Sequence, residues 1–153
     1  EHGRFGQKTG QGFYSYPDGR TRQDDTEALT LIREAAKELG VQRRQDITDK
    51  EILDRCLCAL VNRGAQLLDE GVALRASDID VVWTAGYGFP NYRGGPMFYG
   101  DTLGLDQVLN VFERNAKEFG NSYGYWTPAP LLVDLASQGK SFAIYDAEQK
   151  GPA

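Results

Sequence analysis

The stretch ITDKEILDRCLCALVNRGAQLLDEG, residues 47–71, decides the fold of this chain. Thr48 followed three residues later by Glu51 is a capping box, in which each side chain binds a backbone N–H group at the start of a helix. The isoleucines that flank this box stand at the positions of a hydrophobic staple, so a second signal marks the same start. We therefore predict a helix over residues 49–70.

The predicted helix has a wide apolar face at helical spacing. Its members are Ile52, Leu53, Cys56, Leu57, Leu60, Val61, Leu67 and Leu68. At 1.5 Å per residue the helix is roughly 33 Å long, and fully burying one leucine side chain contributes roughly 1.5 to 3 kcal/mol. This face alone can anchor the core of a small domain.

Further helices are predicted on both sides of this one. One begins with Asp24 and Glu27, and a short one begins with a cap formed by Ser77 and Asp80. Others cover residues 105–119 and 130–138. Gly95-Pro96 marks a further helix start, because proline at the first helical position loses no needed donor. No stretch between these elements alternates for long with the period of two that strands show. The predicted fold class is all-α, a helical bundle with a short extended segment near the N-terminus.

The stretch GYGFPNYRGGPMFYGD, residues 86–101, combines glycines, aromatic residues, prolines and one arginine. An RNA-binding surface, a phosphate-binding loop and a tight corner between helices all use such residues. The corner is favoured, because glycine permits positive φ and aromatic rings fill the space between helices that meet steeply. We expect Phe98 and Tyr99 to face inward in this corner.

Composition argues against several classes of protein. Seventeen Lys and Arg against 22 Asp and Glu give a formal net charge of -5, which leaves no basic field to attract a nucleic acid. No apolar run reaches the roughly 20 residues that a membrane-spanning helix needs. Cys56 and Cys58 are two residues apart in a predicted helix and point to different faces, which argues against a metal site or a disulfide. We expect no nucleic-acid partner, no membrane span, no bound metal and a reducing compartment.

Several linked motifs resemble one known family. They are SDID (77–80), GYGFP (86–90), RGGPMF (93–98), DTLGL (101–105), PAPLL (128–132) and GKSF (139–142). Together they are similar to the second C-terminal domain of L-3-hydroxyacyl-CoA dehydrogenases, in the version found in multifunctional fatty acid β-oxidation enzymes that also carry an enoyl-CoA hydratase. GRFGQKTGQGFY, residues 3–14, resembles the closing segment of the first C-terminal dehydrogenase domain.

The resemblance implies a division of the chain into segments. They are the tail of the first C-terminal domain (1–20), a linker helix and connector (21–46), the second helical domain (47–145) and a disordered tail (146–153). It also implies an internal duplication, in which residues 139–145 are a shortened counterpart of residues 3–16. In single-copy relatives the helical domain forms a dimer, so two copies in one chain resemble a dimer interface folded into a single molecule.

The chemistry of the family implies which groups this chain lacks. The dehydrogenase reaction needs a Gly-rich nucleotide-binding domain and a His–Glu pair, and no G-x-G-x-x-G motif follows a strand here. The one histidine, His2, is interpreted as a solvated residue. The family's substrate-contacting Asn precedes an Arg, and Asp54 before Arg55 matches that pair. Asp54 is interpreted as a solvated carboxylate, and no catalytic, cofactor-binding or metal-binding residue is assigned.

The predicted function is that of a C-terminal helical fragment of an NAD-dependent 3-hydroxyacyl-CoA dehydrogenase of fatty acid β-oxidation. It supports the cleft for acyl-CoA and NAD by intramolecular pseudo-dimer packing and is not catalytic alone. Its expected partners are the nucleotide-binding and first helical domains of the parent enzyme, which binds NAD and acyl-CoA. The alternative is a standalone helical module for protein interaction or dimerisation without enzymatic activity. Self-association is expected from either.

Three cations are candidate contacts for a ligand or for a neighbouring domain: Arg93, Lys8 and Lys140. Arg93 lies in the stretch of glycines and aromatic residues. It either pairs with Asp80 or Asp101, or meets an anionic ligand or a neighbouring domain. A further interpretation is that the three cations contact the phosphates of CoA, although they are scattered in sequence.

The last residues of the sequence, KGPA (150–153), lack the Ser-Lys-Leu ending of peroxisomal proteins. On this ground we expect the protein in the cytoplasm of a bacterium.

Overall fold

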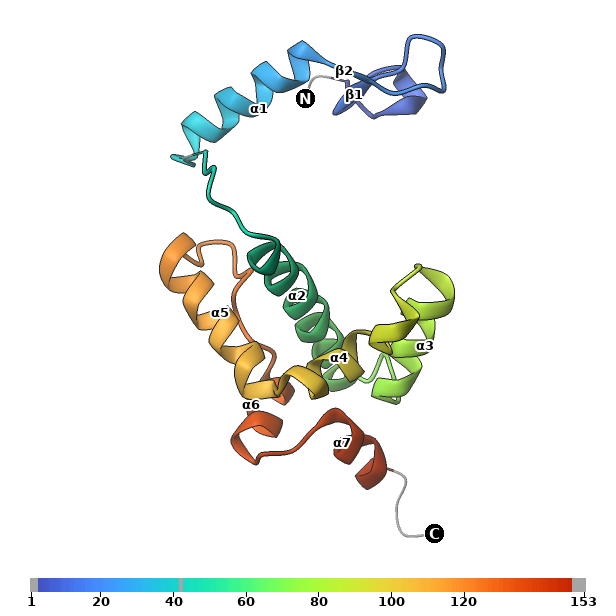
Figure 1. Ribbon diagram of the computed structural model, residues 1–153, viewed down its shortest axis with the longest axis vertical. Coiled ribbons are helices and arrows are strands. Elements are labelled where there is room, and N and C mark those ends of the chain that lie inside the picture. Colours follow the sequence, from blue (N-terminus) through green and yellow to red (C-terminus); the bar gives the residue numbers. More distant parts are fainter. Residues whose placement is uncertain (1–2, 42, 150–153) are drawn as a thin grey trace. The chain divides into compact units, whose positions relative to one another are not determined.

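A computed structural model gives the fold of residues 3–41 and 43–149. The chain divides into two compact units, Glu1–Asp46 (unit 1) and Ile47–Ala153 (unit 2), and each is described by itself (Figure 1). No helix within the described residues is both long and apolar enough to cross a membrane.

Unit 1 combines a small hairpin with one helix. Its elements are the 3-10 turn η1 (Gln7–Thr9), the strands β1 (Tyr14–Ser15) and β2 (Gln23–Asp24), and the helix α1 (Thr26–Glu38). Strand β1 pairs with β2 in antiparallel register. The boundary expected between residues 20 and 21 therefore falls inside a hairpin, and the tail and the linker helix form one unit.

Helix α1 begins one residue later than expected. The Asp25 carboxylate accepts a hydrogen bond from the Ala28 N–H at 3.0 Å, whereas Asp24 belongs to β2. Arg4 donates to Asp25 at 2.5 Å and to Glu27 at 2.7 Å. One arginine thus fastens the N-terminal segment to the start of α1. The Ala28 N–H and the Arg4 guanidinium together lower the pKa of Asp25.

Unit 2 is built of helices, as the all-α prediction requires. They are α2 (Asp49–Asp69), α3 (Ala76–Gly86), α4 (Pro96–Leu103), α5 (Leu105–Phe119), α6 (Pro130–Ser137) and α7 (Phe142–Gln149), with a 3-10 turn η2 (Asn91–Arg93) before α4. Helix α2 packs against α3, α4, α5 and α6, and α4 also contacts α3, α5 and α7 (Figure 1). Helices α2 and α4 therefore hold the other helices together.

The start of α2 is confirmed, but part of its buried face differs from the predicted one. The Thr48 hydroxyl accepts a hydrogen bond from the Glu51 N–H at 3.2 Å, and Gly71 follows the helix at a φ of 69°. The buried stripe is Asp54, Cys58, Val61, Asn62, Gly64, Ala65 and Leu68, whereas Ile52, Leu53 and Cys56 are exposed. Val61 and Leu68 belong to both the predicted and the observed face, and Leu57, Leu60 and Leu67 are partly buried. The prediction is wrong for the first turns of α2, because the buried stripe there contains the polar Asp54, which a count of large apolar residues leaves out.

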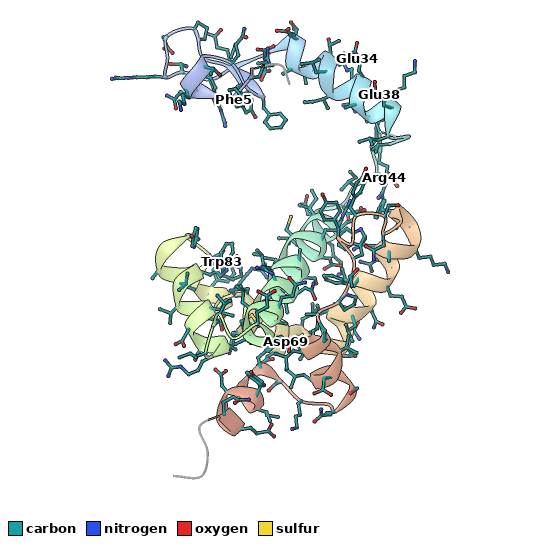
Figure 2. All side chains as sticks on the ribbon, turned by 180° about the vertical axis from the view of Figure 1, so that it is seen from behind. Phe5, Glu34, Glu38, Arg44, Asp69 and Trp83 are labelled. Atoms are coloured by element: carbon teal, nitrogen blue, oxygen red, sulfur yellow. The ribbon has the colours of Figure 1, made fainter. Side chains whose placement is uncertain are left out.

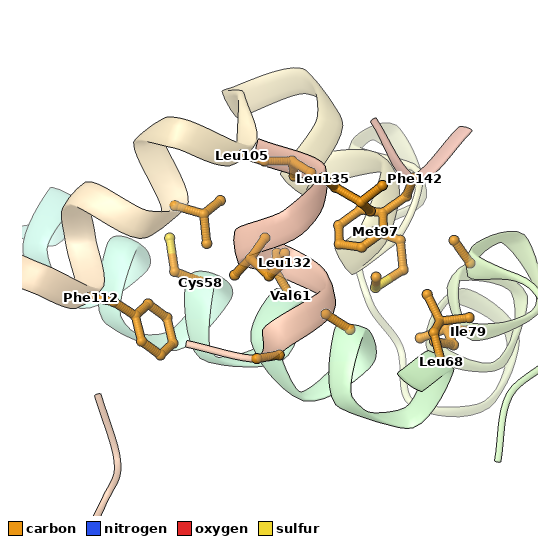
Figure 3. Packing of buried hydrophobic residues seen from close by; sticks show 14 of the residues in the cluster. Cys58, Val61, Leu68, Ile79, Met97, Leu105, Phe112, Leu132, Leu135 and Phe142 are labelled. Carbon is orange, nitrogen blue, oxygen red and sulfur yellow. The ribbon is translucent and has the colours of Figure 1, made fainter. Parts of the chain in front are cut away.

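The core of unit 2 lies between α2 and the helices around it (Figure 3). Its largest fully buried apolar side chains are Phe112, Phe142, Met97, Leu132, Val61 and Val108. A buried amide also crosses the core: Asn62 of α2 donates to the Thr127 carbonyl at 3.1 Å and accepts from the Ala129 N–H at 2.6 Å. Asn62 thereby joins α2 to the segment that leads into α6.

The glycine-aromatic stretch forms a corner between α3 and α4, as predicted. Of the two aromatic residues expected to face inward, Tyr99 is partly buried against the core, whereas Phe98 is 59% exposed. Met97, which is 1% exposed, is the residue that points fully inward. The Met97 sulfur fills the space beside Gly64 of α2, where an added Cβ would collide with it. A helix crossing at close range is thus the reason for glycine at position 64.

Three aspartates of unit 2 each cap the start of another helix, and we call them the cap circuit. Asp80 of α3 caps α4, Asp101 of α4 caps α7, and Asp146 of α7 caps α3. The bonds run to Asp80 from the N–H groups of Met97 (2.7 Å) and Phe98 (3.0 Å), to Asp101 from Phe142 (2.8 Å) and Ala143 (3.0 Å), and to Asp146 from Ala76 (2.7 Å) and Ser77 (3.1 Å).

The cap circuit corrects the predicted start of α3. Ser77 and Asp80 were expected to cap their own helix, but the residue before α3 makes no side-chain cap and Asp146 binds the first N–H groups instead. Asp80 points to the start of α4. A carboxylate one turn inside its own helix can accept hydrogen bonds from the start of a neighbouring helix. Sequence spacing alone does not show which helix start it binds.

Burial raises the pKa of both Asp80 and Asp101 above the ordinary value of 3.8, and repulsion from the other carboxylates of the circuit adds to the effect. The folded state therefore holds these protons more tightly than the unfolded chain. We expect the free energy of unfolding of unit 2 from these two groups to fall as pH rises from the ordinary Asp value through the raised values.

Carbon-13 chemical shifts of the carboxyl groups, followed by NMR against pH, test this expectation. Asp80 and Asp101 should titrate above 3.8, and both pKa values should fall in the variant Asp146→Asn, which removes a neighbouring negative charge. Asp25 of unit 1 is the internal contrast, because its pKa is lowered. A pKa of Asp80 or Asp101 at or below the ordinary value would show that the hydrogen bonds from backbone N–H groups outweigh the effect of burial.

Two predictions about the segment that forms α7 are wrong. Residues 146–149 are helical where a disordered tail was expected, and 150–153 lie outside the described residues. Residues 142–145 also begin a helix, whereas their proposed counterpart near the N-terminus forms a 3-10 turn and a strand. Burial of Phe142 and the bonds of Asp146 to α3 provide the physical reason for the helix.

Candidate functional site

Arg93 lies in η2 and its guanidinium is held on aromatic rings. Its central carbon is 5.4 Å from the centroid of the Tyr92 ring and 5.7 Å from that of Tyr99. Among the described residues Arg93 forms no ion pair; its Nε donates to the Tyr92 hydroxyl at 3.4 Å, and Asp80 and Asp101 bind backbone N–H groups of other helices. Pairing with either aspartate, one of the predicted alternatives, is therefore wrong.

The three candidate cations do not form one anion site within unit 2. Lys8 belongs to η1 of unit 1. Lys140 lies between α6 and α7, where its Nζ pairs with Glu148 at 2.8 Å. Arg93 has different neighbours, so within the described part of unit 2 Arg93 and Lys140 have no shared partner. His2 lies outside the described residues.

A polar recess of about 270 Å³ lies between α2 and α5, and of its lining the sequence had singled out Asp54 as a candidate position. Its lining residues are Thr48, Lys50, Glu51, Asp54, Arg114, Asn115 and Glu118. Asp54 stands at its centre, with Lys50 Nζ at 2.7 Å and an Arg114 nitrogen at 3.3 Å from its carboxylate. Two cations therefore neutralise one acidic group.

The burial of Asp54 corrects its interpretation as a solvated carboxylate. Only 8% of its side chain is exposed, whereas its partners Lys50 and Arg114 are 78% and 54% exposed. A buried carboxylate needs partners because loss of its hydration is costly. Lys50 lies one turn before Asp54, and this spacing of opposite charges was the signal in the sequence.

Arg55, next to Asp54, does not line the recess and contacts aromatic rings instead. Its guanidinium carbon is 4.4 Å from the centroid of the Phe119 ring and 5.6 Å from that of Trp126. It also forms an ion pair with Glu51 at 3.4 Å. Arg55 thus packs the end of α5 and the following loop onto α2.

Near the recess, Cys58 of α2 and Asn115 of α5 are both buried. Burial and the negative charge of Asp54 raise the pKa of Cys58 to about 11, so this thiol stays protonated at neutral pH. Asn115 is 1% exposed, and its Nδ2 has no hydrogen-bond partner among the described residues. Within the same residues no three His, Cys, Asp or Glu side chains are arranged to hold a metal ion. The interactions observed in the recess are the ion pairs of Asp54 with Lys50 and Arg114.

Unit 1 has an open apolar groove in place of a core (Figure 2 shows its side chains). We call it the unit 1 groove; it has a volume of about 630 Å³ and is lined by Gly3, Arg4, Phe5, Gly6, Gly12, Phe13, Tyr14, Tyr16, Ala28, Leu31 and Ile32. Phe5 and Phe13 are 71% and 79% exposed, and Ala28 is the one buried apolar residue described in this unit. The groove offers apolar surface that unit 1 cannot cover by itself.

Comparison with known sequences identifies the family. Residues 52–143 match the family described as 3-hydroxyacyl-CoA dehydrogenase, C-terminal domain. The chain belongs to this family. The matched residues lie within unit 2, and the dehydrogenase C-terminal domain is thus the helical bundle around α2 and α4.

Curated relatives of this dehydrogenase domain are long enzymes. The chain is 41% identical over 141 residues to the peroxisomal bifunctional enzyme of Danio rerio, and 40% identical over 141 residues to that of Homo sapiens. It is 35% identical over 140 residues to the peroxisomal fatty acid beta-oxidation multifunctional protein AIM1 of Arabidopsis thaliana. Each match covers 90% or 91% of the chain but 19% of the relative. The family resemblance inferred from the motifs is confirmed.

The same relatives overturn the expected location. Their names place them in peroxisomes of animals and plants, and other relatives are glyoxysomal, which conflicts with the cytoplasm of a bacterium. The expectation rested on the residues KGPA at the end of this sequence.

Proposed function

We propose that this chain is a supporting, non-catalytic module of an NAD-dependent 3-hydroxyacyl-CoA dehydrogenase of fatty acid β-oxidation. The observation that carries the proposal is the unit 1 groove. A segment that exposes Phe5 and Phe13 and buries little apolar surface of its own is stable only when another domain covers it. The parent's nucleotide-binding and first helical domains are the proposed partners, and these bind NAD and acyl-CoA.

Unit 2 supplies a second surface for the same packing. Its exposed apolar residues around the glycine-aromatic corner are Val81, Val82, Tyr87, Tyr92 and Phe98. We assign this surface to contact with the first helical copy, in the manner of a dimer interface within one chain. Arg93, stacked beside Tyr92, is the proposed interdomain cation. Lys8 and Lys140 are left as proposed peripheral contacts of the assembled enzyme.

The neutralised recess supports the non-catalytic role. The family resemblance matches Asp54 to an Asn that contacts substrate in the catalytic copy. A carboxylate that is 8% exposed and already paired with Lys50 and Arg114 has no free hydrogen-bond donor to offer a substrate carbonyl. We propose that the recess between α2 and α5 is a structural charge pair rather than a second active site.

The isolated 153-residue chain is therefore expected to show no turnover with acetoacetyl-CoA and NADH. Its parent enzyme, at the same molar concentration, should oxidise NADH, which is followed by absorbance. The physical reason is that the nucleotide site and the base of the reaction belong to other parts of the parent. Measurable turnover by the isolated chain, above that of the heat-denatured sample, would sink the non-catalytic assignment.

The role of the unit 1 groove is tested in the full-length parent. We expect Ile32→Asp, which places a charge in the groove, to lower both the dehydrogenase rate and the melting temperature, by several degrees for a loss of about 1 to 2 kcal/mol. Thr30→Asp is the matched control, since it adds the same charge to an exposed position of α1 that does not line the groove. Equal effects of the two substitutions would contradict a covered groove.

A further inference from the structure

The cap circuit of Asp80, Asp101 and Asp146 closes on itself. Helix α3 holds the start of α4, α4 holds the start of α7, and α7 holds the start of α3. In each helix, the first N–H group bound by the circuit lies four residues before the aspartate that the helix contributes. The pairs are residues 76 and 80 in α3, 97 and 101 in α4, and 142 and 146 in α7. The three helices therefore present one repeated arrangement, with a capped start and a capping carboxylate one turn later.

No ion pair balances the charge of the circuit among the described residues, and the cation Arg75 attracts Asp146 only through space. Within the described residues, Arg75 pairs with Asp78 at 2.6 Å and Lys140 with Glu148 at 2.8 Å, and neither cation forms an ion pair with the circuit. The positive ends of the three helix dipoles and their unpaired N–H groups take the place of a cation. Each carboxylate is thus bound only as long as the neighbouring helix start stays in position.

Close packing ties the circuit to the core. Gly95, just before α4, has no room for a Cβ because the side chain of Asp80 occupies that space. Gly100 of α4 lies against Val61 and Phe142, and Phe142 at the start of α7 is 1% exposed. A movement of α7 would withdraw Phe142 and Asp146 together, from the core and from α3.

We propose that the cap circuit makes α3, α4 and α7 one conformational unit, a clasp that α7 closes and that opens at all three helix starts together. Loss of any one carboxylate loosens the two helix starts that it does not touch. The device couples the last described helix of the chain to the glycine-aromatic corner, since α4 follows that corner directly. The inference concerns unit 2 alone and does not depend on the proposed role in the parent enzyme.

Amide hydrogen exchange of the full 153-residue chain, measured by NMR, tests the clasp. In Asp146→Asn we expect exchange of the Met97 and Phe98 N–H groups to rise by about tenfold or more, although Asp146 contacts neither. Asp78→Asn is the matched control, because Asp78 is an aspartate of α3 outside the circuit. It should leave these two amides unchanged.

Two results would overturn the proposal. Faster exchange confined to Ala76 and Ser77 in Asp146→Asn would show three independent caps. An equal rise throughout α5 would show general unfolding rather than a separate clasp. Should the variant fail to fold, exchange of the unaltered chain in low urea decides: the three helix starts should share one opening free energy and one urea dependence, distinct from those of α5, and separate values would refute the clasp.

Discussion

Gly95→Ala is expected to destabilise unit 2 by roughly 3 to 5 kcal/mol, which combines backbone strain with a steric clash. Gly95 has a φ of 110° and a ψ of 170°, a region that residues with a Cβ avoid. The added Cβ would also collide with the side chain of Asp80, which caps α4 from this position. The substitution therefore strains the backbone and displaces a helix cap at once.

The control for this prediction is Gly86→Ala. Gly86 is the last residue of α3, has no positive φ, and an added Cβ would meet no atom within 4 Å. Its replacement should change stability by less than about 1 kcal/mol. Urea denaturation followed by circular dichroism measures both variants. Similar unfolding midpoints for the two would contradict the close approach of Asp80 to Gly95.

Phe112→Ala is expected to destabilise unit 2 by about 3 to 5 kcal/mol. Phe112 of α5 is 1% exposed and meets the Trp126 ring edge-on, with the ring centroids 5.7 Å apart. Truncation removes this contact and leaves a cavity between α5 and α2 that rigid helices fill only in part. Thermal unfolding should show the loss as a melting temperature lowered by at least several degrees.

Phe98→Ala is the matched control for Phe112→Ala. The same atoms are removed from a ring that is 59% exposed, so the loss should be below about 1 kcal/mol in the isolated chain. A loss as large as that of Phe112→Ala would show that Phe98 is covered by other residues of the chain. A small loss for Phe112→Ala would instead contradict the core described between α2 and α5.

Local signals predicted the helices well. Thr48 and Glu51 fixed the start of α2 because a capping box is made within four consecutive residues. Pro96 and Pro130 marked the starts of α4 and α6 in the same way, since proline at a first helical position loses no needed donor. Such features depend on backbone geometry close by in sequence, and a sequence pattern therefore suffices to find them.

Local patterns did not predict the hydrogen bonds and ion pairs between residues that lie far apart in the sequence. Ser77 and Asp80 have the spacing of a cap, yet Asp80 caps α4 and Asp146 takes its place at α3. Asp54 was interpreted as solvated because an acidic residue on a helix usually is. Its burial depends on Arg114, which is 60 residues away in sequence and reaches it at 3.3 Å.

The sequence by itself determined the fold class, the helices of unit 2 from α2 to α6 and, through its linked motifs, the family, but it did not predict α7. Caps, helical periodicity and helix-ending glycines act between residues a few positions apart, so they are encoded locally. The tertiary structure alone decided which face of α2 is buried, where Asp80, Asp101 and Asp146 point, and that unit 1 has a groove and little core. Those properties depend on which helix lies next to which, because burial and long-range hydrogen bonds are made between residues that only the folded chain brings together.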